Sequence, residues 1–233
     1  VELGSVVTKA TLADAFAVAL RRLGLAVVKG KAPGQPARVG ADGLMVCDDA
    51  ECPVLATLAE KLSIIVLAKA GSLVPGGGLW LHTQRPEWND ANNALVGNGL
   101  SVVTLAHLRR FLAFIAALPG AERPFGLSAA TLAALRGLAE LVRATPASAA
   151  SDPVARRTFV DRAGPLLDAW RAEAYRGAAG RTPARAETGL LTGLAQDLLP
   201  LVDATLARCR RDDGLFHSYN LVDFSTPGRA EVS

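Results

Sequence analysis

The sequence predicts a mainly α-helical protein built from antiparallel helical hairpins. Three observations lead to this prediction. Six or so long segments carry apolar residues at helical spacing, glycine- and proline-rich stretches separate them, and few segments alternate as a strand would. Helices that are apolar over wide arcs pack in layers, so the candidate architectures are an antiparallel bundle and part of an α/α toroid. We expect residues 1–233 to form a single helical domain.

The N-terminal part is expected to contain two helices separated by irregular chain. Residues 6–23 have helical spacing and are followed by a stopping glycine. Short extended pieces are expected at 25–29 and 43–47, on either side of a loop over 30–43 that holds two prolines and four glycines. The second helix is expected over 53–70. Its β-branched centre leaves a strand open as an alternative.

The remainder of the chain is expected to contain four longer helices. Ser101 is placed to cap the first of them, and Pro119 follows its end. Pro200 falls inside the last, which predicts a kink or a division into two helices. Irregular chain is expected at the glycine-rich residues 71–78 and in the tail, 212–233. The expected bounds of the four helices are 101–118, 127–145, 152–177 and 186–211.

Composition limits the classes of function. The net charge is only +3 and the basic residues are scattered, so we expect no nucleic-acid partner. Charged residues interrupt the most apolar runs, 54–70 and 100–118, so no membrane span is expected. No signal-peptide pattern is visible, which predicts a cytoplasmic protein. Cys47, Cys52 and Cys209 have too few neighbouring ligands for a zinc site, so we expect reduced thiols and no metal.

The segment 85–101 carries most of the residues on which a chemical function could depend. Glu87 and Asp90 are three residues apart, and burial and like charge can separate the pKa values of two carboxyls into an acid and a base. Trp88 offers a flat apolar face and an N–H donor. Arg85 could bind a carboxylate or phosphate, and the asparagine amides suit a hydroxyl-rich ligand. These asparagines are Asn89, Asn92 and Asn93. A polyol or sugar is therefore the expected ligand class.

The same residues also fit a structural interpretation. Asn89 or Asp90 can cap a short helix over 91–96, with Trp88 packed beneath it. Caps of this kind are common at helix starts. Spacing alone leaves both interpretations open.

A longer signature covers about residues 80–112. It resembles that of large, mostly uncharacterised bacterial proteins related to α/α-toroid carbohydrate enzymes. Trp88-Asn89-Asp90 is also similar to the Trp-Asn-Asp motif of cellobiose and chitobiose phosphorylases, inverting enzymes built on an (α/α)6 barrel. The resemblance implies that Asp90 is the general acid that protonates the glycosidic oxygen, with Trp88 and Asn89 lining the sugar site. The matching stretches are 85–97, 99–105 and 108–110.

A weaker echo of the signature occurs at 214–220. His217, Tyr219 and Asn220 form a polar and aromatic cluster there that could bind substrate at the same site, because exposed loops often carry binding residues. His82, just before the motif, could approach a ligand for the same reason. An inverting hydrolase also needs a second carboxylate about 6.5–9.5 Å from the acid. The candidates for it are Glu87, Asp48, Asp49 and Asp223.

The sequence also departs from the phosphorylase pattern. An (α/α)6 barrel has about twelve helices, whereas six or seven are predicted, so the chain corresponds to an incomplete barrel. We therefore expect a fragment of a larger catalytic domain, with further domains of a longer parent chain as partners. No matching phosphate-binding set is found. Hydrolysis and phosphorolysis with inorganic phosphate as co-substrate both stay open, and no other cofactor is expected. The alternatives are a non-catalytic helical module that binds a glycan or packs on another domain, and a purely structural fragment.

Overall fold

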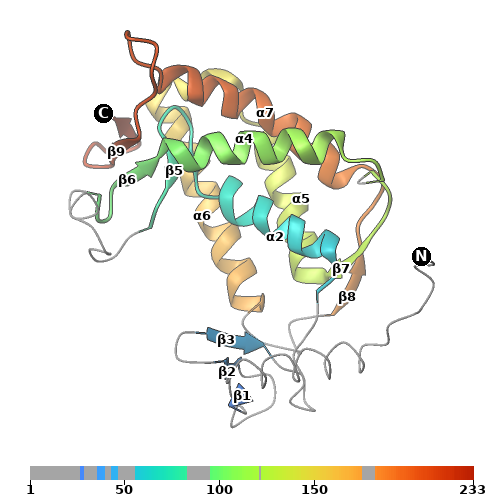
Figure 1. Ribbon diagram of the computed structural model, residues 1–233. Coiled ribbons are helices and arrows are strands. Elements are labelled where there is room, and N and C mark those ends of the chain that lie inside the picture. The colour runs from blue at the N-terminus through green and yellow to red at the C-terminus, as the bar shows by residue number, and fades with distance from the viewer. Residues whose placement is uncertain are drawn as a thin grey trace.

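The computed structural model describes residues 27–28, 36–39, 43–46, 56–82, 95–120, 122–174 and 182–233. Within them, five α-helices pack around an apolar core, and a five-stranded antiparallel sheet lies at one end of the helices (Figure 1). The predicted mainly helical class is therefore confirmed. The sheet was not predicted, and its strands come mostly from the two segments that were expected to be irregular.

The helices begin close to the capping residues that the sequence indicates. Ser101 Oγ accepts a hydrogen bond from Thr104 N at 3.1 Å and so caps α4. Ser128 Oγ caps α5 in the same way, accepting from Thr131 N at 3.3 Å. The bounds are α2 Leu58–Ala70, α4 Val102–Ala117, α5 Ala129–Arg143, α6 Pro153–Ala174 and α7 Leu190–Arg208. The first predicted helix, over 6–23, lies outside the described residues.

Two alternatives for the helices are decided by the structure. The β-branched centre of the predicted helix 53–70 is not a strand, because it lies within α2, Leu58–Ala70. Pro200 lies inside one continuous helix, so the division of 186–211 into two helices is wrong. The reason is packing: Leu198 and Leu201, on either side of the proline, are both buried and hold α7 against its neighbours despite the missing N–H.

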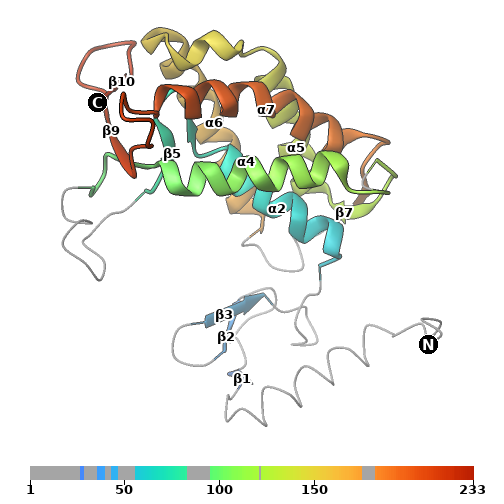
Figure 2. The same ribbon diagram turned by 45° about the horizontal axis from the view of Figure 1, so that its top comes forward.

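The main core lies between the helices. In Figures 1 and 2, α4 leads away from the sheet and α7 lies beside it, returning towards the sheet. α5 packs against both α6 and α7. The fully buried side chains of this core include Leu67, Leu105, Leu112, Leu135, Leu138, Phe159, Leu194 and Leu198. Helix α7 is also long and apolar enough to cross a membrane by length and composition alone, but a helix buried in a core passes the same test.

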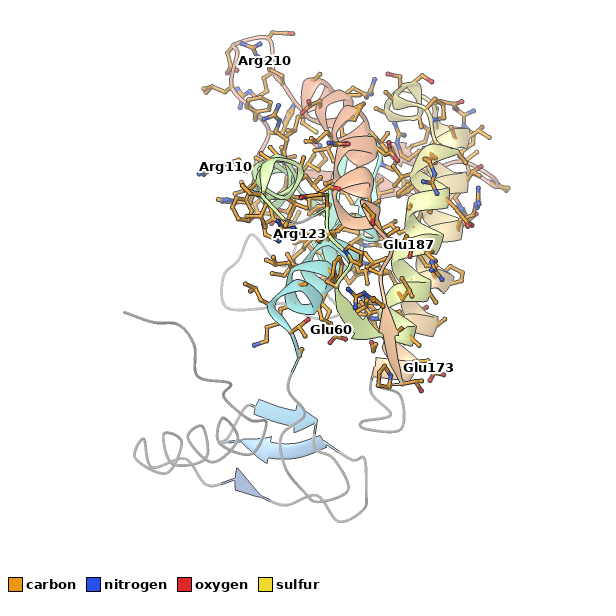
Figure 3. All side chains as sticks on the ribbon, turned by 90° about the vertical axis from the view of Figure 1, so that its right-hand side faces the viewer. Glu60, Arg110, Arg123, Glu173, Glu187 and Arg210 are labelled. Atoms are coloured by element: carbon orange, nitrogen blue, oxygen red, sulfur yellow. The ribbon has the colours of Figure 1, made fainter. Side chains whose placement is uncertain are left out.

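Helices α2 and α5 are joined at their N-terminal ends by a buried carboxylate. Glu60 is 4% exposed, and its Oε1 accepts from Ser128 N at 3.1 Å (Figure 3). Just before α5, the strand β7 (Gly126–Ser128) pairs with β8 (Pro183–Arg185). A separate antiparallel sheet in the N-terminal part has the order β1-β2-β3. Its strands are β1 Val27–Val28, β2 Pro36–Val39 and β3 Gly43–Val46, so part of the loop predicted over 30–43 is a strand.

The five-stranded sheet joins three distant parts of the chain. Its order is β10-β9-β6-β5-β4, with antiparallel neighbours throughout. In register, Leu79 lies opposite Ser101, and Leu100 lies opposite Asn220. The strands are β4 Leu73–Val74, β5 Gly78–Trp80, β6 Gly99–Ser101, β9 Tyr219–Asp223 and β10 Glu231–Val232. The segments 71–78 and 212–233 are therefore not wholly irregular, because each contributes strands to this sheet.

A buried arginine holds the turn between β4 and β5. Arg156, on α6, is 2% exposed. Its Nε donates to Pro75 O, its Nη1 to Ala230 O and its Nη2 to Ala150 O, the last at 2.9 Å. Ala150 ends the 3₁₀ helix η1 (Ala147–Ala150), and Ala230 precedes β10. One guanidinium therefore ties three loops together, and its burial lowers the pKa of Arg156.

The glycines of this turn are required by close approach of other backbone. Gly76 has φ +78°, and a Cβ there would lie 1.9 Å from Ala150 O. Its N–H donates to Thr205 Oγ1 at 3.0 Å. A Cβ on Gly77 would lie 2.4 Å from the Leu100 side chain. The turn closed by the bond from Gly77 N to Val74 O, at 2.9 Å, is thus tightly packed between β4 and β5.

Candidate functional site

Most of the predicted site residues lie outside the described part of the chain. They are Arg85, Glu87, Trp88, Asn89, Asp90, Asn92 and Asn93. The described chain stops at His82, directly after β5, and resumes at Leu95, directly before β6. These two strands are neighbours, and Leu81 N donates to Gly99 O at 3.0 Å. The residues that flank the segment 83–94 are therefore held side by side at one end of two neighbouring strands.

Trp80 contacts both flanks of that segment. Its ring stacks on His82 with a centroid separation of 4.9 Å and an interplanar angle of 22°. Its Nε1–H donates to Gly97 O at 2.8 Å. The same indole contacts Phe224 at 5.3 Å, and the guanidinium of Arg157 lies 5.3 Å from the Phe224 centroid. This run of contacts connects the flanks of 83–94 to β9 and to α6.

A pocket of about 200 Å³ opens beside His82, between the hairpin β4–β5 and α6. Its polar lining consists of Ser72, His82, Asp168 and Arg171. The apolar lining is Leu73, Trp80, Val160 and Leu167, with Gly71 and Gly164. Asp168 and Arg171 lie one turn apart on α6, and Arg171 Nη1 is 3.6 Å from Asp168 Oδ1. Their side chains are 79% and 41% exposed, so both can reach a molecule in the pocket.

The hydrogen bonds around His82 define its tautomer. Ser72 Oγ donates to Ala68 O at 2.9 Å, so it can only accept from His82 Nε2, which is 3.2 Å away. The neutral ring then carries its proton on Nε2 and has an acceptor lone pair at Nδ1. Burial, and next the charge of Arg171, lower the pKa of His82, while Asp168 opposes the shift. His82 is therefore neutral at pH 7.

The backbone of His82 is also unusual. Its φ is +53°, the one positive φ among the described residues other than glycine. Such a conformation costs of order 1–2 kcal/mol in a residue with a Cβ. It persists here because the ring is held on both sides, by the stack on Trp80 and by the bond to Ser72. A strained residue with a lowered pKa beside a pocket is a site candidate on physical grounds.

The cluster predicted at 214–220 is divided by the structure. Asn220 is buried, and its Nδ2 donates to Gly77 O at 2.7 Å and to Cys209 Sγ at 3.3 Å. Tyr219 points to the opposite face of β9 and is 43% exposed. His217 lines a recess of about 490 Å³ at the end of α7. The other residues that line it are Arg210, Arg211, Asp212 and Asp213.

The echo at 214–220 nevertheless lies beside part of the longer signature. β9 pairs with β6, so residues 219–221 lie opposite residues 99–101. Val222 N donates to Asn98 O at 2.9 Å, which extends this contact towards the segment 83–94. The structure thus brings the echo next to the end of the motif, although it places the three side chains in different surroundings.

The third cysteine has no reactive features. Cys209 is 1% exposed, and its thiol lies 3.7 Å from Gly77 O. Burial raises the pKa of Cys209, so the sulfur keeps its proton at neutral pH. Cys47 and Cys52 lie outside the described residues. Among the residues that the structure describes, no group of three His, Cys, Asp or Glu side chains could hold a metal.

Of the pocket residues, sequence reasoning singled out only His82 and missed Ser72, Trp80, Asp168 and Arg171. The spacing of three between Asp168 and Arg171 on a helix is the signal of a shared face, but it is equally typical of a surface ion pair. Nothing in the sequence places that face beside His82. Figure 3 shows the labelled Arg110, Arg123 and Arg210 at different places on the described part of the molecule.

No protein-family model matches the sequence, and the curated proteins contain no significant match to it. The class that the fold defines is therefore a mainly helical protein with an antiparallel sheet at one end of its helices.

Proposed function

We propose that this chain is part of a carbohydrate-active protein of the α/α-toroid type. In this proposal, Asp90 is the general acid that protonates the oxygen of a glycosidic bond. The observation that supports it most is the position of the segment carrying Asp90: both of its flanks are held by Trp80, beside a pocket lined by hydrogen-bonding groups. The helices α4 to α7 would form part of the toroid.

The remaining motif residues have supporting roles in this proposal. Glu87 or another carboxylate activates the attacking water, or inorganic phosphate attacks in its place. Trp88 covers the apolar face of a sugar ring, and Arg85 with the asparagines binds hydroxyl groups. His217 and Tyr219 are exposed and can contribute to a binding surface. Asn220 supports the site indirectly, because its amide holds the hairpin that carries Trp80.

The test is turnover of a panel of β- and α-glycosides, with and without inorganic phosphate. We expect Asp90→Asn to lower turnover about 10²–10⁴-fold, because the amide cannot donate the proton to the leaving oxygen. The melting temperature should not fall, which separates loss of chemistry from loss of fold. Full turnover by Asp90→Asn would contradict the proposal.

The alternative is a non-catalytic module that binds a glycan or packs on another domain. It predicts sugar affinity that depends on Trp88 and no turnover of any glycoside by the wild-type chain. A glycan-array screen of the wild type and of Trp88→Ala, run beside the turnover panel, distinguishes the two.

A further inference from the structure

We infer that the pocket formed by Ser72, Trp80, His82, Asp168 and Arg171 is a binding subsite for one neutral pyranose ring. The sugar class rests on the proposed function. The site itself rests on the pocket geometry, and three of its five residues, Ser72, Asp168 and Arg171, lie outside the signature at about 80–112. We call it the α6 subsite.

Its size favours a single ring. The pocket volume is about 200 Å³, below the ~300–1,000 Å³ of pockets that enclose drug-sized ligands. Gly164 leaves one wall open, because a Cβ built there would meet no atom within 4 Å. Leu73, Val160 and Leu167 give an apolar wall for the C–H face of a ring. Only one terminal sugar unit of an oligosaccharide would fit, and the rest of its chain would lie outside the pocket.

The polar groups match the vicinal hydroxyls of a pyranose. Each hydroxyl both donates and accepts, so it needs an acceptor and a donor close together. Asp168 supplies acceptors and Arg171 supplies donors. Their separation of 3.6 Å exceeds the 2.7–2.9 Å of a charge-assisted hydrogen bond, so neither group is saturated by the other. His82 Nδ1 adds a third, neutral acceptor, since its Nε2–H is directed at Ser72.

The charges favour a neutral ring over an acidic one. Asp168 and Arg171 cancel, and His82 is uncharged at pH 7. The carboxylate of an acidic sugar could bind Arg171 only by also approaching the negative charge of Asp168, which would repel it. No other charged side chain lines this pocket among the residues that the structure describes.

The experiment is a titration with methyl glucopyranoside, methyl N-acetylglucosaminide and methyl glucuronide, followed by the indole N–H resonance of Trp80 in NMR spectra. We expect both neutral glycosides to shift this resonance with millimolar dissociation constants, and the glucuronide to bind more weakly. Addition to about 10 mM covers a 1 mM dissociation constant. Absence of any shift at that concentration, or tighter binding of the glucuronide, overturns the inference.

Two kinds of variant test the assignment. Asp168→Ala and Arg171→Met should each weaken binding of the neutral glycosides about tenfold, which is the effect of losing one charge-assisted bond of about 1.4 kcal/mol. Asp203→Ala is the control, because it removes one partner of an exposed ion pair, with Arg109, outside the pocket lining. Gly164→Leu should block the pocket without a loss of stability, and Gly193→Leu is its control on α7, where the added Cβ is equally unhindered. Unchanged binding in Asp168→Ala and Gly164→Leu overturns the subsite.

The failure of the subsite and the failure of the proposed function give different results. Asp90→Asn should leave binding of the methyl glycosides unchanged, because Asp90 is not part of the α6 subsite. If that variant loses turnover while Asp168→Ala and Gly164→Leu bind normally, the function stands and the subsite is overturned. If the glycosides bind in a manner that depends on Asp168 and no glycoside is cleaved, the subsite stands and the proposed catalysis is wrong.

Discussion

The two ends of α6 carry arginines with opposite surroundings. Arg156, in the first turn, is buried and donates to three backbone carbonyls from three loops. Arg171, in the last turn, is 41% exposed and faces Asp168 at a distance longer than a hydrogen bond. Each of the three guanidinium nitrogens of Arg156 is bonded to the fold, whereas those of Arg171 are available to a ligand. An arginine that is buried and fully hydrogen-bonded to the fold has a structural role. An exposed arginine whose donors lack such partners can bind a ligand, so residue type alone does not separate the two roles.

The largest effect should follow from substitution of Arg156. In Arg156→Met, three carbonyl oxygens lose their donor, and each buried unsatisfied acceptor costs about 1–3 kcal/mol. We expect unfolding in denaturant to show a loss of about 3 kcal/mol or more. Arg156→Lys keeps the charge but not the planar set of donors, so its stability should lie between that of the wild type and that of Arg156→Met.

Arg171→Met is the matched control for that comparison. An exposed pair such as this one contributes roughly 0–1 kcal/mol, so its loss should be nearly silent in the same denaturation experiment. Equal losses in Arg156→Met and Arg171→Met would break the distinction between the two ends of the helix.

The next largest effect should come from the turn that Arg156 holds. Gly76→Ala places a methyl group 1.9 Å from Ala150 O on a backbone with φ +78°. We expect a loss of about 2–3 kcal/mol from the sum of steric and conformational costs. Gly97→Ala has a similar φ of +80° but meets no atom within 4 Å, so it should lose only about 1 kcal/mol. Thermal unfolding of the two variants separates the packing cost from the backbone cost, and an equal loss in both would contradict the close approach.

A smaller effect is expected at Trp80, which links the rigid hairpin to the pocket. Trp80→Phe keeps a ring against His82 but removes the bond from Nε1 to Gly97 O. We expect a loss of stability of about 1 kcal/mol. Binding of methyl glucopyranoside should weaken as well, because the bond to Gly97 O fixes the orientation of the indole that lines the pocket. His82 resonances report this binding where the indole probe is absent. Unchanged stability and affinity would show that the bond to Gly97 O fixes neither the hairpin nor the pocket.

The sequence predicts the helices well because their signals are local. Ser101 and Ser128 lie just before apolar residues at helical spacing, and both act as caps. The sheet gives no comparable signal. Its strands have two to five residues, and its pairs, such as Leu100 with Asn220, join segments far apart in the chain. Short strands held by distant partners cannot be recognised from periodicity.

The candidate site shows the same limit. His82 could be singled out because it precedes an unusual motif. Asp168 and Arg171 could not, since they become relevant only when α6 packs beside the hairpin β4–β5. Asn220 shows the reverse error: a polar residue in a presumed loop is in fact buried and bonded to the Gly77 carbonyl. Every residue has a backbone carbonyl, so a hydrogen bond to one cannot be predicted from residue types. For the same reason the role of Arg156 was not predicted from the sequence.

The smallest expected effect is on the pH dependence of stability, and it sharpens the contrast between the saturated and the open end of α6. Burial and Arg171 lower the pKa of His82 below its ordinary 6.5. The unfolded chain therefore binds more protons at this residue than the folded chain does, and stability falls as the pH drops below 6.5 through the folded pKa. His82→Gln should flatten the slope of unfolding free energy between pH 7 and pH 5.

The two shifted carboxyls act below the pH range of this experiment. Arg136 lowers the pKa of Glu187, and bonds from Ser225 lower that of Asp223, so the stability that each contributes is lost as the pH falls below its ordinary pKa of 4.5 or 3.8. Arg171→Met removes the nearby positive charge and should reduce the slope without abolishing it, because burial is the larger cause of the shift. Asp168→Ala removes the charge that opposes the shift and should steepen the slope. An unchanged slope in His82→Gln would show that the imidazole is as free to take up a proton in the folded chain as in the unfolded one, and that the contact with Ser72 and the stack on Trp80 do not hold it neutral.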